Sequence, residues 1–534
     1  MSAKPRPKVE EKVSSHQRDH QLDDENLTPD EEYPHGKDFV AIVTALLLAF
    51  IIVGLDYTVL ATAVPTMTKH FGTIEDIGWY TSVYRLTASS FQFLFGKSYT
   101  LFPVKRILVI TLVLFAGGVL ACALAPTSPF FIMGRGVTGF AAAGVIAGAF
   151  SMIIRSFPLS KRSIYAGIGG AAEATACLTA PLIGGFLTDR LSWRWCFYVE
   201  LPLIGAAFII VVFFFNPKKD PSSPSTFREK LAQLDLLGMT FFVPSITFLM
   251  LGLQWGGTKY GWQDWRIIAI FCVFAVLLLL FCWLQYRKQD CATLPPRIVS
   301  QRNIIFGFIF SCCNNAALSI IEYYMPIYFQ AVKGLSASMS GVMVLPVVAG
   351  LVLSVFSSGV LTSHLGYYTP FMLSTSIITP PAVGLMTTLG VDATLASLIG
   401  YQALLGFGVG IGFQGPQVAV QTILPQKDTP VGIAFIQFAQ GIGPAVFVAA
   451  AQTLFTQRLA HNIKHFAPEV DYTSLSRDGL VNLSSYVKAQ SLAGAIRSVS
   501  TAVMQTFYLP VALSCMTLVG ALGMEWRSVK KKHV

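Results

Sequence analysis

Four charged side chains stand inside long apolar stretches of this sequence: Asp56, Arg85, Arg135 and Glu173. If these stretches cross a membrane, each charge costs at least about 2.5 kcal/mol, so each is a candidate for function. A buried carboxyl can bind and release a proton, and a nearby guanidinium can control that carboxyl without losing its own proton. We therefore expect proton-coupling chemistry at Asp56, Arg135 and Glu173.

Asp56 and Arg135 lie at similar depths in their stretches and carry opposite charges, which predicts a switchable ion pair. The alternative is a structural role, with Asp56 as a hydrogen-bond partner in helix packing and Arg135 in a fixed pair or bonded to backbone carbonyls. Arg85 lies at a comparable depth. It could pair with Asp56, contact an anionic substrate, or extend its charge outward to the membrane surface.

Glu173 lies near the middle of its stretch, on a face of small residues. Gly169, Glu173, Ala176, Ala180 and Gly184 are spaced so that a helix places all of them on one side. Small residues allow helices to approach closely. An acid at such a contact is a candidate proton or cation site; the alternative is a permanently protonated carboxyl bonded to a neighbouring hydroxyl.

Uncharged polar and aromatic residues in the second half of the chain could line a ligand cavity, because such cavities are mostly apolar with a few polar groups. With Arg85, the candidates for substrate binding are Asn314, Asn315, Tyr324, Gln414, Gln417, Gln437 and Gln440. A phosphate-binding GxxxxGK[ST] loop, a Cys/His metal spacing and a Ser/His/Asp set are all absent. We expect no cofactor, no metal and no enzymatic activity.

The elements that must hold these side chains are about fourteen apolar blocks of roughly 20 residues, the length that a helix needs to cross a bilayer. Hydrophobic residues make up 53% of the chain and charged residues 12%. The blocks are continuous rather than alternating, which excludes a β-barrel. The predicted fold class is an all-α polytopic membrane protein with fourteen transmembrane helices, forming two six-helix bundles plus two central linker helices.

Lys and Arg gather in the tails and in alternate connections of a chain whose net charge is +10, which predicts that both termini are cytoplasmic. Asn482 begins a glycosylation sequon in an expected outer loop, although such a tripeptide also arises by chance. The expected segments are a disordered cytoplasmic tail (1–38), an N-terminal six-helix bundle (39–215), a cytoplasmic linker (216–235), two additional spans (236–286), a second cytoplasmic linker (287–302), a C-terminal six-helix bundle (303–525) with its outer loop (457–500), and a cytoplasmic tail (526–534).

Several stretches are similar to motifs of one transporter family. They are LDYTVLATAVP (55–65), IMGRGVTGFAAAG (132–144), WRWCFYVELPLIG (193–205) and YYMPIYFQAVKG (323–334). From about Phe39 to Trp526 the sequence resembles the major facilitator superfamily, and most of all its 14-span drug:proton antiporter branch with the fungal toxin and multidrug efflux carriers.

The resemblance includes the antiporter motif of the fifth span. The matching residues are Gly167, Ala180, Pro181, Gly184 and Gly185. Ala176 and Ala180 stand where the motif has Gly, so the packing of this span is less certain to follow the family. In the first interhelical loop, Thr100 and Pro103 stand where the family motif has an Asp and a Gly. The gating contact that this Asp makes in the family therefore cannot be transferred to this chain.

The resemblance implies a proton-coupled efflux transporter that exports small amphipathic molecules, such as a toxin, secondary metabolite or drug, by alternating access. The expected partners are a small-molecule substrate, protons and the lipid bilayer, with no nucleic acid, and the chain is expected to be a monomer. The plasma membrane is the expected location, with the vacuolar membrane as an alternative. A proton-coupled uptake symporter, such as a siderophore carrier, and a non-transporting membrane sensor are the competing functions.

Overall fold

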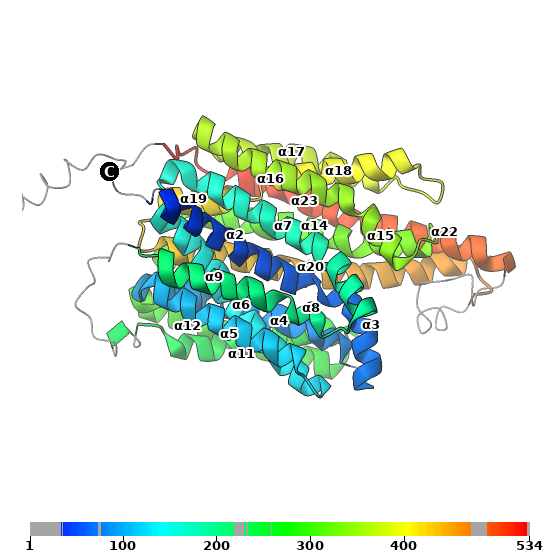
Figure 1. Cartoon of the computed structure of the whole chain (residues 1–534). Coiled ribbons are helices and arrows are strands. Elements are labelled where there is room, and N and C mark those ends of the chain that lie inside the picture. Colours follow the sequence, from blue (N-terminus) through cyan, green and yellow to red (C-terminus); the bar gives the residue numbers. More distant parts are fainter. Residues whose placement is uncertain are drawn as a thin grey trace, which may run out of the picture.

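The computed structural model of the protein describes residues 34–530, apart from 35, 73–75, 218–228, 231–232, 258 and 471–488. The described residues form long helices that run side by side in one bundle (Figure 1). Twelve of these helices are long and apolar enough to cross a membrane. The described part of the chain contains no β-strand beyond two isolated bridges, so the expected all-α membrane fold is confirmed.

The first half of the chain supplies the helices that hold all four charged candidates. These helices are α2 (Gly36–Thr58), α3 (Leu60–Phe71), α4 (Ile77–Leu101), α5 (Val104–Ala123), α6 (Ser128–Ser156), α7 (Leu159–Arg190), α8 (Trp195–Tyr198) and α9 (Glu200–Phe214). Pro202 lacks an N–H for the carbonyl of Tyr198, which explains the break between α8 and α9.

Two further helices and a short connection join the halves. They are α11 (Leu236–Trp255), α12 (Trp265–Lys288), η1 (Gln289–Cys291) and α13 (Pro296–Val299). The second half consists of α14 (Arg302–Ala331), α15 (Ala337–Met343), α16 (Leu345–Leu365), α17 (Thr369–Met386), α18 (Leu395–Ile411), α19 (Gly415–Ile423), α20 (Thr429–Phe466), α22 (Ala489–Thr506) and α23 (Tyr508–Leu522). Two apolar cores, one in each half, hold these helices together.

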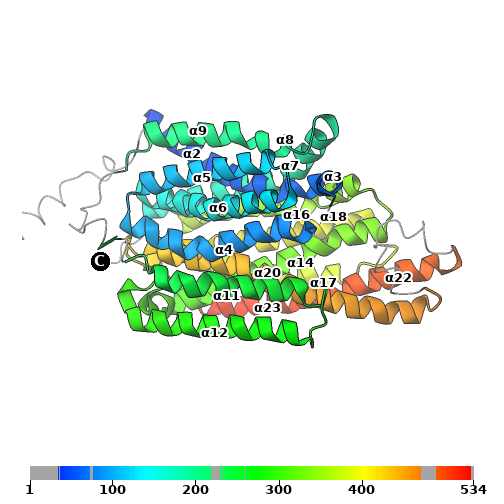
Figure 2. The same cartoon turned by 90° about the horizontal axis from the view of Figure 1, so that it is seen from below.

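The number of crossings is twelve by apolar length alone, against the fourteen expected. The two helices that make the difference are α4 and α17. Both lie within the bundle beside helices that do qualify (Figure 2), but α4 carries Arg85, Gln92 and Lys97, and α17 is only 18 residues long with several Ser and Thr residues. The count of fourteen crossings stays a prediction.

The segment expected as an outer loop, 457–500, is helical at both described ends. Helix α20 continues to Phe466, and α22 begins at Ala489. The two helices project together beyond the bundle (Figure 1) and are joined there by the Ser498 hydroxyl, which donates to the Asn462 carbonyl at 3.1 Å. The prediction of a loop was wrong for residues 457–466 and 489–500. A polar sequence can continue a membrane helix outside the apolar layer, because its polar side chains remain hydrated there.

The two halves meet most closely at one end of the bundle. We call it the termini end, because the described chain starts there and ends there (Figure 1), and we call the opposite end the far end. At the termini end, a Cβ on Gly167 of α7 would lie 3.2 Å from Gly359 Cα of α16, and one on Gly96 of α4 would lie 2.7 Å from Ala434 Cβ of α20. The absence of side chains at these glycines therefore allows the halves to approach closely.

Helices α11 and α12 pack together against one side of the bundle, next to α4 (Figure 2). Aromatic side chains fill this contact, with the rings of Phe93 and Phe242 5.1 Å apart and those of Phe242 and Phe281 4.8 Å apart. At the start of α11, the buried Asp235 accepts hydrogen bonds from Lys288 at 2.5 Å and from Gln285 at 2.8 Å. Asp235 thereby ties the two helices to each other.

Candidate functional site

Asp56 near the end of α2 and Arg135 of α6 form an ion pair inside the first half. The guanidinium of Arg135 donates to Asp56 Oδ1 at 2.5 Å, to the Asp56 carbonyl at 3.3 Å and to the Tyr80 carbonyl at 3.2 Å. Both residues have an exposed fraction of 0%. The expected pairing is therefore confirmed, whereas its role in transport stays a prediction.

One oxygen of this pair is not satisfied. Asp56 Oδ2 is buried and has no hydrogen-bond partner among the described residues. Buried polar atoms are nearly always hydrogen-bonded, and an exception calls for a functional explanation. An unpartnered carboxylate oxygen in a closed, apolar environment is a place where a proton can bind.

A stack of side chains runs outward from this pair. The Arg135 guanidinium lies 4.5 Å from the centre of the Tyr84 ring, the Tyr84 and Tyr57 rings are 6.2 Å apart, and the Arg85 guanidinium lies 4.6 Å from the centre of the Tyr57 ring. Tyr84 is buried, whereas Tyr57 and Arg85 are exposed. Arg85 thus contacts an aromatic ring and is not the ion-pair partner of Asp56.

The exposed end of the stack belongs to a group of residues that we call the central site: Tyr57, Arg85, Glu173 and Glu322. They come from α2, α4, α7 and α14, and therefore from both halves. Tyr57 interacts electrostatically with the other three, and Glu322 interacts with Arg85. Glu173 is half-buried and Glu322 is exposed, so the central site is accessible and holds two acids and one base.

The small-residue face of α7 packs on α2, as its spacing predicts. A Cβ on Gly54 of α2 would lie 3.0 Å from Ala176 Cβ and 2.7 Å from the Glu173 carbonyl, and one on Gly169 would lie 2.4 Å from the Phe50 ring. The backbone of Glu173 is therefore fixed against α2. The described structure gives the Glu173 carboxyl no hydrogen bond or ion pair in this conformation, and its role in transport stays a prediction.

The residues of the antiporter motif lie in different surroundings along α7. Gly167 lies at the close contact with α16, and Ala180 is fully buried. Pro181 lies within the helix, and Gly184 accepts a hydrogen bond from the Cys196 thiol at 3.6 Å. A Cβ on Gly185 would meet no atom within 4 Å. The motif thus contributes one contact between the halves and several within the first half.

The amides expected to bind substrate fall into two groups, and the first lies between the halves. Gln437 of α20 accepts a hydrogen bond from Gln92 of α4. The Nε2 atom of Gln414 lies 2.5 Å from where a Cβ on Gly170 of α7 would be, and Gln414 Oε1 is buried without a partner in the described structure. Gln437 and Gln414 therefore face the first half across the molecular centre.

The second group lies inside the second half. Tyr324 is fully buried and donates to Gln452 at 3.0 Å. Asn314 donates to the Val409 carbonyl at 3.3 Å, and Asn315 donates to the carbonyl of Ser311 on its own helix at 3.0 Å. A rotation of the Gln417 amide lets it accept from Gln440 at 2.8 Å. These contacts place Tyr324 in the packing between α14 and α20 rather than at the central site.

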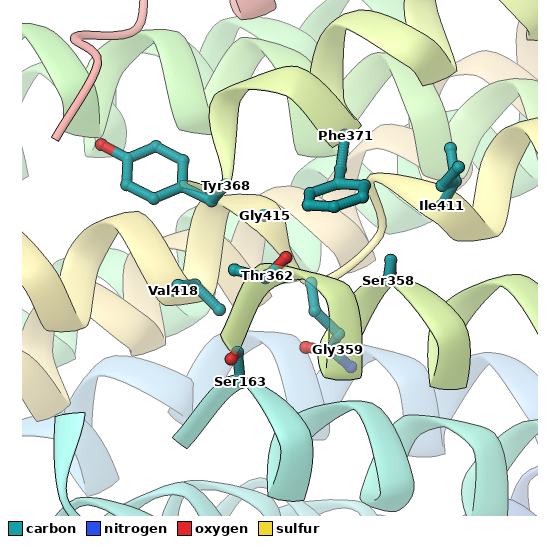
Figure 3. A pocket seen from close by; sticks show the side chains of 10 residues that line it. Ser163, Ser358, Gly359, Thr362, Tyr368, Phe371, Ile411, Gly415 and Val418 are labelled. Carbon is teal, nitrogen blue, oxygen red and sulfur yellow. The ribbon is translucent and has the colours of Figure 1, made fainter. Parts of the chain in front are cut away.

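A small pocket, lined in part by Gln414, lies between the halves (Figure 3). Ser163 of α7 borders it on one side, and Ser358, Thr362, Tyr368 and Phe371 border it on the other. The pocket has room for about one water molecule. At this contact between the halves there is no room for a drug-sized molecule in this conformation.

Glu200 is a buried acid that the sequence interpretation missed. It is the first residue of α9, has an exposed fraction of 0% and interacts electrostatically with Asp56 and Arg135. The signal was available, since Glu200 lies five residues after Trp195 in an otherwise apolar block. The stretch that contains it, WRWCFYVELPLIG, resembles a family motif, and that resemblance does not single out its acid.

The profile of the Major Facilitator Superfamily matches residues 46–448, which is well over half of the chain. The chain belongs to this superfamily. Its curated relatives include the MFS-type transporter astH of Aspergillus oryzae, 42% identical over 511 residues that cover 96% of this chain and 91% of the relative. The MFS-type efflux pump MFS1 of Trichophyton rubrum is 42% identical, with 93% of each chain covered.

Solved structures support the same fold. The human organic anion transporter MFSD10 (TETRAN) superposes with a TM-score of 0.57 at 13% identity, covering 90% of this chain and all of that chain. The proton:xylose symporter XylE superposes with a TM-score of 0.56 at 14% identity, covering 90% of this chain and 94% of that chain. At these identities the likeness concerns the fold alone.

In this major facilitator protein, charged residues also fasten the termini end. Arg297 after η1 donates to both carboxylate oxygens of Asp428 at the start of α20, at 2.7 and 3.0 Å, and also to Asp290. These hydrogen bonds raise the pKa of Arg297. Lys97 of α4 donates to the carbonyls of Asp290 and Ala292 at 3.0 and 3.1 Å. The connection before α14 thus contacts both halves at the termini end. Thr100, which stands where the family has its gating Asp, lies on α4 at the same end.

Two further expectations concern glycosylation and metal binding. Asn482, the expected glycosylation site, lies outside the described residues. No group of three or more His, Cys, Asp or Glu side chains that could hold a metal ion occurs in the part of the chain that the structure describes.

Proposed function

We propose that this protein is a proton-coupled efflux transporter that exports small amphipathic molecules by alternating access. The observation that carries the proposal is the buried Asp56–Arg135 pair, with one carboxylate oxygen unpartnered, next to an accessible central site. Tyr84 and Tyr57 connect the pair to that site. A titratable pair that contacts the substrate path through packed rings is what coupling between a proton and a substrate requires.

The coupling step follows from charge. A proton that binds to Asp56 neutralises the carboxylate and weakens its hold on Arg135. Arg135 can then move against the Tyr84 ring, and through Tyr57 the change reaches Arg85 in the central site. Substrate bound among Tyr57, Arg85, Glu173 and Glu322 would favour the opposite movement, so that substrate and proton are bound alternately.

The substrate class is a toxin, a secondary metabolite or a drug. The central site offers an aromatic ring, one cation and two acids, which suits amphipathic molecules with a polar end. Names of relatives agree: a thioclapurine efflux transporter of Claviceps purpurea is 41% identical, and an aspyridones efflux protein of Neocamarosporium betae is 37% identical. The amides Asn314, Asn315, Gln414, Gln417, Gln437 and Gln440 would shape the second half's wall of the path, and Tyr324 would support that wall through its packing between α14 and α20.

The proposed setting is the plasma membrane, with fourteen crossings, a monomeric chain and the termini end in the cytoplasm. Lys and Arg gather in the connections at that end, which supports this orientation. The closed termini end and the accessible central site would then make this conformation outward-facing. In this orientation Asn482 lies outside the cell, where it can be glycosylated.

Expression in a yeast strain that lacks its own drug pumps tests the proposal. The strain should accumulate less of a toxic or fluorescent amphipathic compound than the empty-vector strain, and a protonophore should abolish the difference. A strain that expresses an Asp56→Asn variant at equal surface level is the matched control. Efflux that survives collapse of the gradient, or gradient-driven uptake as in a symporter, would contradict the proposal.

A further inference from the structure

Glu200 shares one buried environment with Asp56 and Arg135, and we call these three residues the buried triad. All three have an exposed fraction of 0%. Neither carboxyl oxygen of Glu200 has a hydrogen-bond partner among the described residues. Glu200 interacts electrostatically with both other members. The triad is therefore one electrostatic unit rather than an ion pair with a distant acid.

The triad contains two acids and only one base. If both carboxyls were ionised, the fully buried triad would carry one net negative charge. An uncompensated buried charge costs several kcal/mol, and a group in that position binds a proton instead. The hydrogen bonds of Arg135 go to Asp56 and to the Tyr80 carbonyl, so the guanidinium gives Glu200 no donor in this conformation. Charge balance thus places one proton in the triad, on Glu200.

The other titratable groups around Glu200 do not supply the missing charge. Tyr84 of α4, Cys122 of α5 and Cys196 of α8 each interact electrostatically with Glu200. In their protonated forms all three are neutral, and none can become a cation. Arg135 is consequently the only positive group that acts on Glu200 in the part of the chain that the structure describes.

We propose that Glu200 holds a proton which the transporter exchanges during its cycle, so that the buried triad is a proton site with two carboxyls and one guanidinium. The inference rests on the proposed function, since it names a further residue for the same coupling. The step moves the proton from the Glu200 carboxyl to Asp56 Oδ2, while Arg135 transfers its hydrogen bonds from the Asp56 carboxylate to the newly ionised Glu200. The triad keeps its charge, and no other reactant is consumed.

Infrared spectroscopy of the purified full-length protein tests where the proton is. The carbonyl stretch of a protonated carboxyl is distinct from that of a carboxylate, and it shifts in deuterated water. At about pH 7 the wild type should show such a band that Glu200→Gln lacks, which assigns that band to Glu200 whatever other carboxyls contribute. Glu322→Gln is the matched control, because Glu322 lies at the central site outside the triad, and the band lost in Glu200→Gln should remain in it.

A second variant tests the charge balance itself. In Asp56→Asn, Arg135 has no carboxylate except Glu200, so Glu200 should ionise and the band should disappear although Glu200 is still present. In the double variant Asp56→Asn with Glu200→Gln, Arg135 has no carboxylate at all. Because an unpaired buried charge is strongly destabilising, the yield of folded double variant should fall about tenfold below that of either single variant.

Transport measurements then test whether the proton is exchanged. Efflux by Glu200→Gln, at surface expression equal to the wild type, should lose its dependence on external pH between about pH 5 and pH 8. A band that persists in Glu200→Gln, or a wild-type pH profile in that variant, would overturn the inference. Wild-type efflux that is insensitive to a protonophore would instead overturn the proposed function while leaving the infrared assignment in place.

Discussion

The two halves of the transporter bury polar groups of different kinds. The first half buries a charged set in its core, namely Asp56, Arg135 and Glu200. The spans of the second half bury amides instead, and their described residues include no fully buried charge. These amides are Asn303, Asn314, Gln402, Gln414, Gln417, Gln421 and Asn462. Since amides do not titrate, we expect the first half to handle the proton and the second half mainly to shape the substrate path.

The buried acids also differ among themselves in how fully their oxygens are hydrogen-bonded, and Asp235, which lies outside the spans, shows the contrast. Asp235 accepts hydrogen bonds from Lys288, Gln285, Gly238 and Thr293, whereas Asp56 leaves one oxygen and Glu200 leaves both oxygens without a partner in the described structure. A fully satisfied buried acid holds helices together. An unsatisfied one retains the capacity to change its protonation.

Removing the only base of the buried triad should have the largest effect. Arg135→Met leaves two buried carboxyls without a cation, and breaking a buried pair costs about 3–5 kcal/mol. We expect little folded protein at the cell surface, measured by quantitative fluorescence of a tagged chain. Arg194→Met is the control, because Arg194 is only half-buried and stacks on Trp193 at 4.4 Å. Normal surface levels for Arg135→Met would show that the triad does not depend on its positive charge.

Asp235→Asn should cost less, about 1–3 kcal/mol, because it leaves the partners of a buried carboxylate unsatisfied. Burial alone would raise the pKa of Asp235, but hydrogen bonds from Lys288, Gln285 and the Gly238 and Thr293 amides outweigh it and lower this pKa. The carboxylate therefore stabilises the fold above about pH 4 and loses that contribution as the pH falls further.

Thermal unfolding of purified Asp235→Asn checks this prediction. The midpoint should lie below that of the wild type at neutral pH, and the gap should narrow in acid. The control is Asp264→Asn at the start of α12, where the carboxyl accepts a hydrogen bond from the Arg266 amide at 2.9 Å at an exposed position. A constant gap between Asp235→Asn and the wild type down to acidic pH would contradict the assigned charge.

Glu173→Gln should leave stability nearly unchanged and alter transport. The backbone at Glu173 packs on Gly54, and Gln keeps the volume of the side chain. If Glu173 carries a proton or meets a cationic substrate, the substrate range or the pH profile of efflux should change about tenfold at constant surface expression, as expected for loss of one charged contact. A wild-type rate, range and pH profile would assign Glu173 to packing alone.

The smallest change in coupling is expected in the second half. Gln414→Leu keeps the size of a buried side chain next to Gly170 and removes a polar group that cannot titrate. The apparent KM for an exported compound should shift about two- to tenfold, while the protonophore sensitivity and pH profile remain those of the wild type. Loss of gradient dependence in Gln414→Leu would remove the distinction between the halves.

The sequence predicted the helices and the Asp56–Arg135 pair because apolar length and buried charge are strong signals in a membrane protein. Matched depth along two helices was enough to place opposite charges side by side. The small-residue face of α7 was predictable for the same reason, since spacing along a helix determines which residues share a side.

Other parts of the site depend on how helices from distant segments meet, which spacing does not reveal. Tyr324 looked like a cavity residue but packs between α14 and α20, and Arg85 stacks on Tyr57 instead of pairing with Asp56. Glu200 is visible in the sequence as an acid in an apolar block, but its interaction with the Asp56–Arg135 pair becomes apparent only in the folded structure. The helical ends of this segment, up to Phe466 and from Ala489 onward, were missed because polar residues outside the membrane can remain helical.

The most direct test of the division between the halves is transport by purified protein in liposomes with an imposed pH gradient. Asp56→Asn should exchange labelled substrate across the membrane at nearly the wild-type rate without a gradient, yet fail to accumulate it when the gradient is present. Gln417→Leu, a buried amide variant of the second half, should accumulate substrate in response to the gradient. Gradient-driven accumulation by Asp56→Asn, or its loss in Gln417→Leu with exchange intact, would contradict the account.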